Sequence, residues 1–323
     1  MTRAYLNATQ QSPDSRAASS ALPEETEIMN VIAVVGLGHM GGAVARRLDE
    51  KFEVVGFDAA EGARERAGVT TASTLDKAVS DADIVFTSLP NDSIVRDVWL
   101  GPGGLVAAAR EDAIVVELST IMPTTMRDIA SAATGRGVRS VDCPVSGGPG
   151  EAETGRLSLL VGGDDATIDA VSAALEQLGT IRRTGDLGTG KVVKIVNNMM
   201  SMANVLAASE AFSLGCAAGV DPQRLFDVLS VSGGTSQHFT KRWPKALAGD
   251  FTPGFTISLG EKDLALGMEL ARSLRVPSPV AATGREIYQM AMLSGLADQD
   301  IVALQQFYDS WSSERASKKR LGE

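Results

Sequence analysis

A short apolar run that ends in a glycine-rich turn constrains this chain more than any other feature. Residues 31–35, Val-Ile-Ala-Val-Val, form a continuous, mostly β-branched segment of the kind that parallel sheets bury on both faces. Gly36, Gly38 and Gly41 follow directly, and residues 42–49 then have helical spacing. A strand, a Gly-x-Gly-x-x-Gly turn and a helix in this order predict the first unit of a doubly wound α/β sheet.

The spacing of the three glycines predicts a ligand that carries phosphate groups. The first glycine permits a tight turn, the second lets the backbone approach a pyrophosphate, and the third lets the helix pack closely on the strand. Asp58 ends the next strand-like run, where a carboxylate can hold the ribose 2′-hydroxyl of NAD and repel the 2′-phosphate of NADP. We therefore predict NAD as the cofactor, with NADP less favoured, bound by Gly36, Leu37, Gly38, His39, Met40, Gly41 and Asp58.

Polar residues follow two of the later strand-like runs, which span residues 84–87, 114–117, 138–141 and 157–161. Ligands of open parallel sheets bind at the carboxyl ends of the strands. Leu89, Pro90 and Asn91 follow the first of these runs, and we expect them to contact the cofactor. Ser119 and Thr120 follow the second, and we expect both to contact the substrate and Thr120 also the cofactor. Capping of the helix after Pro123 is the alternative role of Thr120.

A further loop, residues 142–150, is rich in small and turn-forming residues. In Ser146, Gly147 and Gly148, backbone amides can converge on an anion such as a carboxylate. A flexible turn without a ligand is the alternative interpretation. We predict that these three residues bind the substrate.

The strand pattern ends at about residue 190, and helical periodicity continues from there. We therefore predict an α/β fold with a Rossmann-type parallel sheet domain over residues 29–189, followed by an all-α domain over residues 190–323. Residues 1–28 have the composition of a disordered leader, and the basic C-terminal segment resembles a frayed tail. Long helical faces rich in Ala, Leu and Met predict a homodimer or homotetramer that assembles through the helical domain.

The first long helix, predicted over residues 192–218, carries an amine and an amide on one face. Lys194 and Asn198 are four residues apart, so their side chains project one turn apart in the same direction. Burial in an apolar cleft would lower the pKa of Lys194 and let it exchange protons near neutrality. A solvated surface lysine is the alternative interpretation.

The composition excludes several classes of function. The 30 basic and 40 acidic residues give a net charge of −10, which disfavours nucleic acid or membrane partners and leaves room for a small anionic substrate in a local cationic site. The two cysteines and two histidines do not form a metal-binding pattern, so we expect no protein-built metal site. No apolar stretch is long enough to span a membrane, and a cytoplasmic location is expected.

Four blocks in this order resemble the β-hydroxyacid dehydrogenase family, which includes 3-hydroxyisobutyrate dehydrogenase and tartronate semialdehyde reductase. The blocks are the glycine turn at residues 36–41, Leu-Ser-Thr at 118–120, Asp-Cys-Pro-Val-Ser-Gly-Gly at 142–148, and the run from Gly188 to Asn198. The resemblance covers the chain from about residue 29 to residue 311. It implies an NAD-dependent oxidoreductase that transfers a hydride between NAD and a small 3-hydroxy acid.

The resemblance also implies roles for individual residues. Lys194 would be the catalytic general acid and base, with Asn198 as its orienting partner. The loop at residues 146–148 would hold the substrate carboxylate, and Thr120 would lie beside the nicotinamide. Lys262 would close over the cofactor from the helical domain, with Phe255 as a wall of the cleft.

Related enzymes leave other activities open. The segment from residue 232 to residue 244 is similar to sulfolactaldehyde reductases, but the intact Ser-Gly-Gly at residues 146–148 favours a carboxylate over a sulfonate. Imine reductases have the same fold but usually lack the lysine, and 6-phosphogluconate dehydrogenases carry His-Asn where this chain has Asn197 and Asn198. A non-catalytic NAD-binding module is the alternative of a different class, which the presence of Lys194 disfavours.

Overall fold

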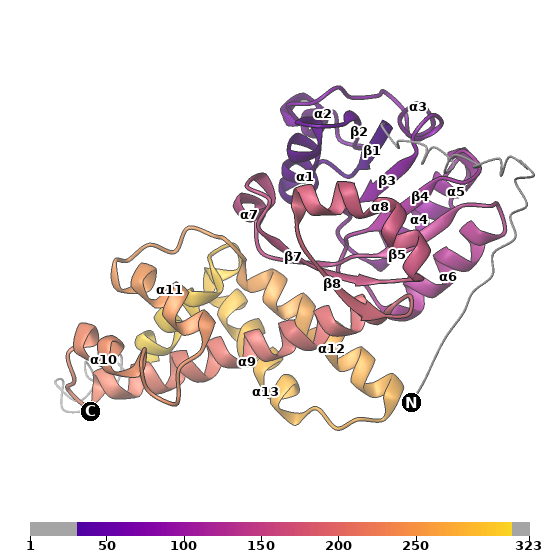
Figure 1. The fold of residues 1–323 in the computed structure, drawn as a ribbon. Helices are drawn as coiled ribbons and strands as arrows, with labels where there is room; N and C mark the ends of the chain where they lie inside the picture. Colours follow the sequence, from indigo (N-terminus) through magenta and orange to yellow (C-terminus); the bar gives the residue numbers. More distant parts are fainter. Residues whose placement is uncertain (1–30, 312–323) are drawn as a thin grey trace, which may run out of the picture.

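A sheet flanked by helices and a group of long helices follow each other along the chain (Figure 1). The computed structural model describes residues 31–311. The predicted leader at residues 1–28 and the basic segment predicted to be a frayed tail, residues 313–320, lie outside this range. The fold agrees with the predicted order of an α/β part followed by a helical part.

The sheet has eight strands in the order β2-β1-β3-β4-β5-β7-β6, with β8 paired to β7. All pairs from β2 to β5 are parallel, as predicted, whereas β7 runs antiparallel to both β5 and β6 and parallel to β8. The sequence patterns did not predict β6 and β8. The strands are β1 (Val31–Val35), β2 (Glu53–Phe57), β3 (Ile84–Thr87), β4 (Ile114–Glu117), β5 (Arg139–Asp142), β6 (Val145–Ser146), β7 (Leu157–Gly162) and β8 (Gly179–Gly185).

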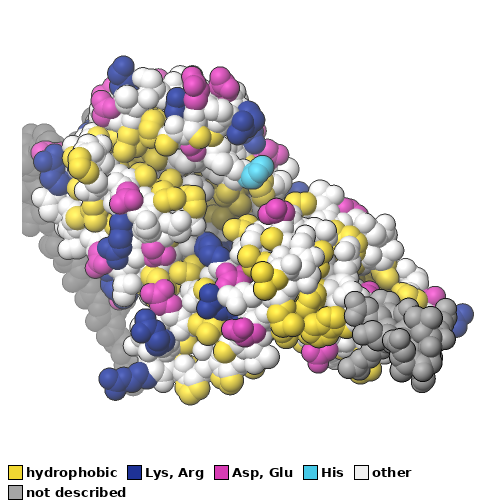
Figure 2. All heavy atoms as spheres, turned by 180° about the vertical axis from the view of Figure 1, so that it is seen from behind, with side chains coloured by type: hydrophobic (Ala, Val, Ile, Leu, Met, Phe, Trp, Pro, Cys, Tyr) yellow, Lys and Arg dark blue, Asp and Glu magenta, His cyan; other side chains and the backbone are white. Residues whose placement is uncertain are grey.

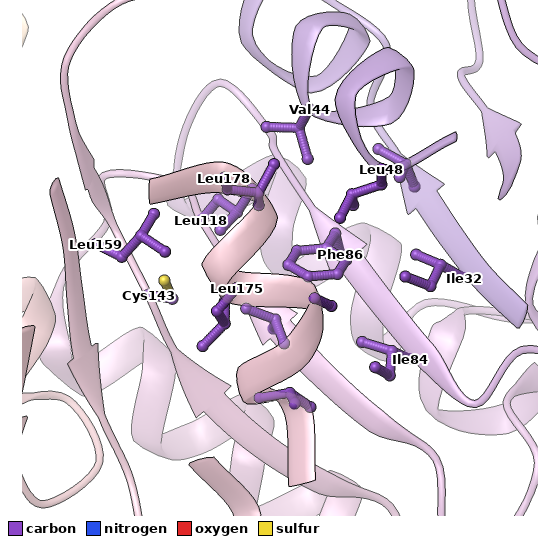
Figure 3. Packing of buried hydrophobic residues seen from close by; sticks show 14 of the residues in the cluster. Ile32, Val44, Leu48, Ile84, Phe86, Leu118, Cys143, Leu159, Leu175 and Leu178 are labelled. Carbon is purple, nitrogen blue, oxygen red and sulfur yellow. The ribbon is translucent and has the colours of Figure 1, made fainter. Parts of the chain in front are cut away.

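Helices cover both faces of this sheet, which explains why its central strands are apolar on both sides. On one face Val44 and Leu48 of α1 and Leu175 and Leu178 of α8 pack on Phe86 of β3 and its neighbours (Figure 3). The other face is covered by α3, α4, α5 and α6, with the fully buried Trp99 among them. The helices of this half are α1 (His39–Asp49), α2 (Glu61–Arg66), α3 (Leu75–Val79), α4 (Asp92–Leu100), α5 (Leu105–Ala108), α6 (Pro123–Thr134), α7 (Pro149–Glu153) and α8 (Asp165–Leu178).

The second half consists of helices around α9, which has 29 residues. Its apolar core combines residues of α9, α12, α13 and the segment after α13, including the fully buried Tyr288. The helix α11 was not predicted from periodicity, whereas α9 lies close to its predicted range of residues 192–218. The elements are α9 (Thr189–Ala217), α10 (Pro222–Leu229), α11 (Gln237–Leu247), α12 (Ile257–Leu274), α13 (Pro279–Ala291), the π turn η1 (Met292–Leu296) and the 3-10 turn η2 (Ile301–Ala303).

The helix α9 joins the two halves. It begins at Thr189 beside the sheet and continues along the helical half (Figure 1). A small cluster of Met122, Ile195 and Leu266 packs where α6, α9 and α12 meet. The division into domains at residues 189 and 190 stays a prediction. Between residues 31 and 311, no helix combines the length and the apolar character needed to cross a membrane.

Candidate active site

The glycine turn after β1 has the geometry that each of its glycines requires. Gly36 has φ +89°, and a Cβ there would lie 2.3 Å from the carbonyl oxygen of Ser88. A Cβ at Gly41 would lie 1.8 Å from the carbonyl oxygen of Gly36, so α1 packs as closely as predicted. A Cβ at Gly38 would meet no atom within 4 Å among the described residues. The backbone at Gly38 is therefore open to a ligand in front of the N-terminus of α1, as a pyrophosphate requires.

Asp58 is fixed beside this turn. Its Oδ2 accepts a hydrogen bond from the Leu37 amide at 2.8 Å, and its Oδ1 accepts one from the Ala60 amide at 2.8 Å. The carboxylate thus links the end of β2 to the glycine turn. Each oxygen keeps a further lone pair, so the same group fits the hydroxyls of a ribose.

The carboxyl ends of β3 and β4 are tied together. The Leu89 amide donates to Ser119 Oγ at 2.7 Å, and Ser119 is buried, so its hydroxyl supports the loop that was predicted to contact the cofactor. Thr120 is half-buried beside it. Asn91 caps α4, since its Oδ1 accepts from the Ile94 amide at 3.0 Å. Lys262 of α12 reaches this loop, where its Nζ lies 3.4 Å from the carbonyl oxygen of Pro90.

The start of α9 is anchored in the sheet by Asp142 at the end of β5. Its Oδ1 accepts from the Gly188 amide at 2.6 Å and its Oδ2 from the Lys191 amide at 3.0 Å. A Cβ at Gly190 would lie 2.2 Å from the carbonyl oxygen of Leu160, so only glycine fits between α9 and β7. The Gly-Thr-Gly sequence therefore sets the position of the whole helix.

Lys191 is buried one turn inside α9 and fully paired. Its Nζ donates to the carbonyl oxygens of Glu117 at 2.6 Å and Ser119 at 2.8 Å, and it lies 3.9 Å from Glu117 Oε1. The Glu117 carboxylate also accepts from the Ser119 amide, from Trp99 Nε1 and from the Thr87 hydroxyl. The network joins α9 to the loop that carries Thr120.

Lys194, one turn further along α9, is placed differently. It is half-buried, and its Nζ makes no hydrogen bond or ion pair with another residue of the described chain. Burial lowers the pKa of Lys194, the charge of Asp263 opposes this shift, and Lys262 adds to it. A larger fraction of the amine is thereby unprotonated near neutrality than for an ordinary lysine.

Asn198 is buried one turn after Lys194. Its Nδ2 donates to Oδ2 of the buried Asp263 at 2.6 Å, and Lys262 Nζ lies 3.6 Å from the other oxygen of that carboxylate. The amide is therefore oriented by α12. Lys194, Asn198 and Lys262 are thus brought together around Asp263, and Lys262 also reaches the carbonyl oxygen of Pro90.

The loop at residues 146–148 presents an occupied amide. The Gly148 amide donates to Glu151 Oε2 at 3.0 Å, and Glu151 Oε1 lies 2.9 Å from Lys241 Nζ on α11. Ser146 is half-buried and Gly147, at φ +130°, is exposed. One of the amides expected to bind the substrate carboxylate is thus already paired with a carboxylate of the protein.

Phe255 lies outside the cluster around Asp263. Its side chain packs on the core of the helical half, and its amide donates to Asp300 Oδ2 at 3.2 Å. Its assignment to the cofactor cleft stays a prediction, as do the assignments of His39 and Met40 at the start of α1.

Sequence reasoning gave no role to Lys191, Glu151 or Asp263. Asp263 adjoins Lys262 in a motif that the family resemblance had singled out, and this adjacency was the available signal. Nothing in the sequence distinguishes Lys191 from an ordinary helix lysine. Within residues 31–311, no group of three or more His, Cys, Asp or Glu residues could hold a metal ion.

The fold and this site define a dinucleotide-dependent oxidoreductase. The surface is hollowed where the sheet-bearing half meets the helical half (Figure 2). The contact of Lys262 with Pro90 connects the same two halves, and Lys194 is close enough to Lys262 and Asp263 to interact with their charges. The family model described as the NAD binding domain of 6-phosphogluconate dehydrogenase matches residues 31–196. A second model, described as the NAD-binding of NADP-dependent 3-hydroxyisobutyrate dehydrogenase, matches residues 188–308.

Individual proteins with similar sequences agree with these family models. The chain is 34% identical to 2-(hydroxymethyl)glutarate dehydrogenase of Eubacterium barkeri, over 84% of this chain and 93% of that protein. It is also 34% identical to 3-sulfolactaldehyde reductase of Escherichia coli K12, over 85% of this chain and 95% of that protein. The solved structure of Mycobacterium tuberculosis 3-hydroxyisobutyrate dehydrogenase with L-serine has a TM-score of 0.80 at 32% identity and covers 87% of this chain and 99% of that one.

The chain belongs to the β-hydroxyacid dehydrogenase family, as the sequence resemblance indicated, and is an NAD(P)-dependent oxidoreductase. A Bacillus cereus imine reductase has a TM-score of 0.58 at 19% identity, over 86% of this chain and 99% of that one, and this likeness extends to the fold alone.

Proposed function

We propose that the protein transfers a hydride between NAD and a small 3-hydroxy acid, with a semialdehyde as the oxidised product and Lys194 as general acid and base. The environment of the Lys194 amine supports this proposal most directly. Its amine is unpaired within the described chain, has a lowered pKa, and lies near a buried carboxylate that also orients Asn198. An unpaired amine of this kind is suited to exchange a proton with a substrate hydroxyl.

The chain's own residues would hold the reactants in register. When bound, NAD supplies the hydride acceptor. The open backbone at Gly38 and the carboxylate of Asp58 would position the dinucleotide, and Lys262 would reach over it from α12. The loop at residues 146–148 would bind the substrate carboxylate, with Ser119 and Thr120 at the adjoining edge of the sheet.

Proton transfer would follow the direction of the reaction. In oxidation, the hydroxyl proton passes to Lys194 Nζ while the carbon of the same C–O bond loses its hydride, and the carbonyl forms. In reduction, Lys194 Nζ gives a proton to the carbonyl oxygen of the substrate while the carbonyl carbon gains a hydride, and the hydroxyl forms. Asn198, held by Asp263, would keep the oxygen within reach of Lys194.

We also propose NAD rather than NADP as the preferred cofactor. Asp58 places a negative charge beside the glycine turn, which would repel a 2′-phosphate. Since the two cysteines, Cys143 and Cys216, are both free thiols, we propose the reducing cytoplasm as the location.

A homodimer or homotetramer through the helical half is part of the proposal. Val193, Val196, Met200 and Leu214 of α9 are exposed, and hydrophobic side chains gather on the helical half in Figure 2. Contiguous apolar surface of this kind marks an interface between subunits. Light scattering on the purified protein would give the mass of the assembly, and a monomer would contradict this part of the proposal.

A substrate panel measured with NAD and NADP in parallel tests the proposed reaction. We expect turnover of one or more short 3-hydroxy acids, faster with NAD than with NADP at equal concentrations. The panel includes a sulfonate analogue, since the Escherichia coli relative is a 3-sulfolactaldehyde reductase. If the enzyme prefers the sulfonate, the substrate group bound by the loop at residues 146–148 is a sulfonate and not a carboxylate. NADH binding without turnover of any hydroxy acid would contradict the proposal that the protein is an enzyme.

A further inference from the structure

The loop at residues 146–148, to which we assign the substrate carboxylate, is already hydrogen-bonded to a carboxylate of the protein, that of Glu151. Glu151 lies in α7, directly after the loop, and its Oε2 accepts a hydrogen bond from the Gly148 amide nitrogen at 3.0 Å. Its Oε1 is paired at 2.9 Å with Lys241 from α11 of the helical half. One side chain thus holds the amide of the substrate loop and a cation from the other half of the molecule at the same time.

This contact conflicts with the use of Gly148 as a substrate donor. A backbone amide has one proton, so the carboxylate of Glu151 and that of a substrate compete for it. The pairing with Lys241 and the hydrogen bond from Gly148 also lower the pKa of Glu151, so the competing group stays ionised at neutral pH.

The Glu151 carboxylate can leave the loop, whereas the Gly148 amide that donates to it is held in place. The side chains of Glu151 and Lys241 are 31% and 71% exposed, so both can turn into solvent. The loop is held on both sides, because the Ala152 amide donates to the Gly148 carbonyl oxygen at 3.1 Å and Ser146 pairs with Ser158 of β7. The Gly148 amide therefore stays in place when Glu151 leaves.

We propose that Glu151 is an internal competitor for the carboxylate of the substrate and sets how strongly the enzyme binds small hydroxy carboxylates. The inference rests on the proposed function, since it assigns a substrate carboxylate to the loop at residues 146–148. Lys241 holds Glu151 in the competing position. Glu151 acts on the binding of substrate and takes no part in the transfer of the hydride or the proton, so it affects KM and leaves kcat unchanged.

The test is a comparison of KM values for 3-hydroxypropanoate, or the best acid of the panel, in the wild type and in Glu151→Ala. We expect KM for the acid to fall about threefold to tenfold, as expected for release of one competing charge-assisted hydrogen bond. The kcat and the KM for NAD stay within about twofold. The KM for the uncharged methyl ester of the same acid does not change, because it has no carboxylate to place on Gly148.

Two variants separate competition at the amide from a general effect of charge. Glu153→Ala removes an equal charge two residues along the same helix, where Glu153 pairs with Arg46 at 2.7 Å inside the sheet-bearing half. We expect its KM to match the wild type. Glu151→Asp keeps the charge but shortens the side chain by one methylene, so we expect it to lose the contact and behave like Glu151→Ala. Melting temperatures of all variants report whether they fold.

Each outcome decides between these ideas. If KM for the acid is unchanged or higher in a folded Glu151→Ala variant, the competition is disproved and the proposed function survives. An equal fall of KM in Glu153→Ala would show that the loss of a nearby negative charge is sufficient, and would also disprove competition at the Gly148 amide. Failure of the wild-type protein to turn over any carboxylate substrate would overturn the proposed function and this inference together.

Discussion

Two lysines on successive turns of α9 show how differently one helix can use the same side chain. Lys191 is fully buried, and its amine donates to two carbonyl oxygens and faces the Glu117 carboxylate. Lys194 is half-buried and makes no hydrogen bond to the described chain. It interacts electrostatically with Asp263, but the two side chains do not form a direct ion pair. The first amine joins two parts of the fold, while the second is left available.

The difference teaches that burial alone does not identify a catalytic lysine. Desolvation lowers the pKa of both amines. The protons of Lys191 are committed to protein oxygens, so a substrate cannot reach them. Lys194 keeps its donor and acceptor capacity for a ligand. The number of protein partners, together with burial, therefore separates the structural lysine from the proposed catalytic one.

The largest effect should come from Lys194→Ala. Loss of the general acid and base lowers kcat by about 10³-fold. The melting temperature and the affinity for NADH stay near the wild-type values, because no other residue of the described chain is hydrogen-bonded to this amine. Steady-state kinetics, thermal unfolding and NADH fluorescence titration measure the three quantities. Turnover equal to the wild type would remove Lys194 from the mechanism.

Lys191→Met should produce the opposite pattern. It leaves two buried carbonyl oxygens and the Glu117 carboxylate without their cation, so we expect the free energy of unfolding to fall by about 3 kcal/mol. Urea unfolding measures this change. Lys51→Met, at an exposed position, serves as the control and should change stability by less than about 0.5 kcal/mol. An undiminished stability in Lys191→Met would show that the buried network is dispensable.

Asp263→Asn should have the smallest effect, and its sign is informative. The charge of Asp263 favours the protonated form of Lys194, so its removal lowers the pKa of Lys194 further. In oxidation the unprotonated amine is active and the rate rises with pH, so this rise should move to lower pH. In reduction the protonated amine is active, so the fall in rate at high pH should also move to lower pH.

The same variant weakens the hydrogen bond that orients Asn198, and we expect the plateau kcat to fall about fivefold, equivalent to about 1 kcal/mol. pH-rate profiles in both directions measure the shift. A displacement toward higher pH would show that another group controls the profile.

The sequence supported the nucleotide-binding part of the fold because its signals are local. The apolar strand, the three glycines and the following helix lie within residues 31–49, and the structure has each of them in place. By contrast, β8 has exposed residues and no apolar alternation, and it is a strand because it pairs with β7. The two-residue β6 likewise depends on its partner.

The site was less accessible to sequence reasoning because its contacts are distant along the chain. Asn198 meets Asp263 across 65 positions, Lys191 meets Glu117 across 74, and Lys241 meets Glu151 across 90. Helical spacing placed Lys194 and Asn198 on one face but could not supply these partners. Gly148 and Glu151 are only three residues apart, but their hydrogen bond was not predicted, because the loop was expected to present its amides to a ligand.

The anchoring of α9 by Asp142 has a consequence for the engineering of chimeric enzymes. The first turns of α9 are held by β5 and β7, and the two matched family segments overlap at residues 188–196. A recombination point at the boundary between residues 189 and 190 would separate Lys194 from the carboxylate that seats its helix. Crossovers placed beyond Ser201 would keep Lys194 and Asn198 with the sheet and would exchange the helices that pack on them, including Lys262 and Asp263 of α12.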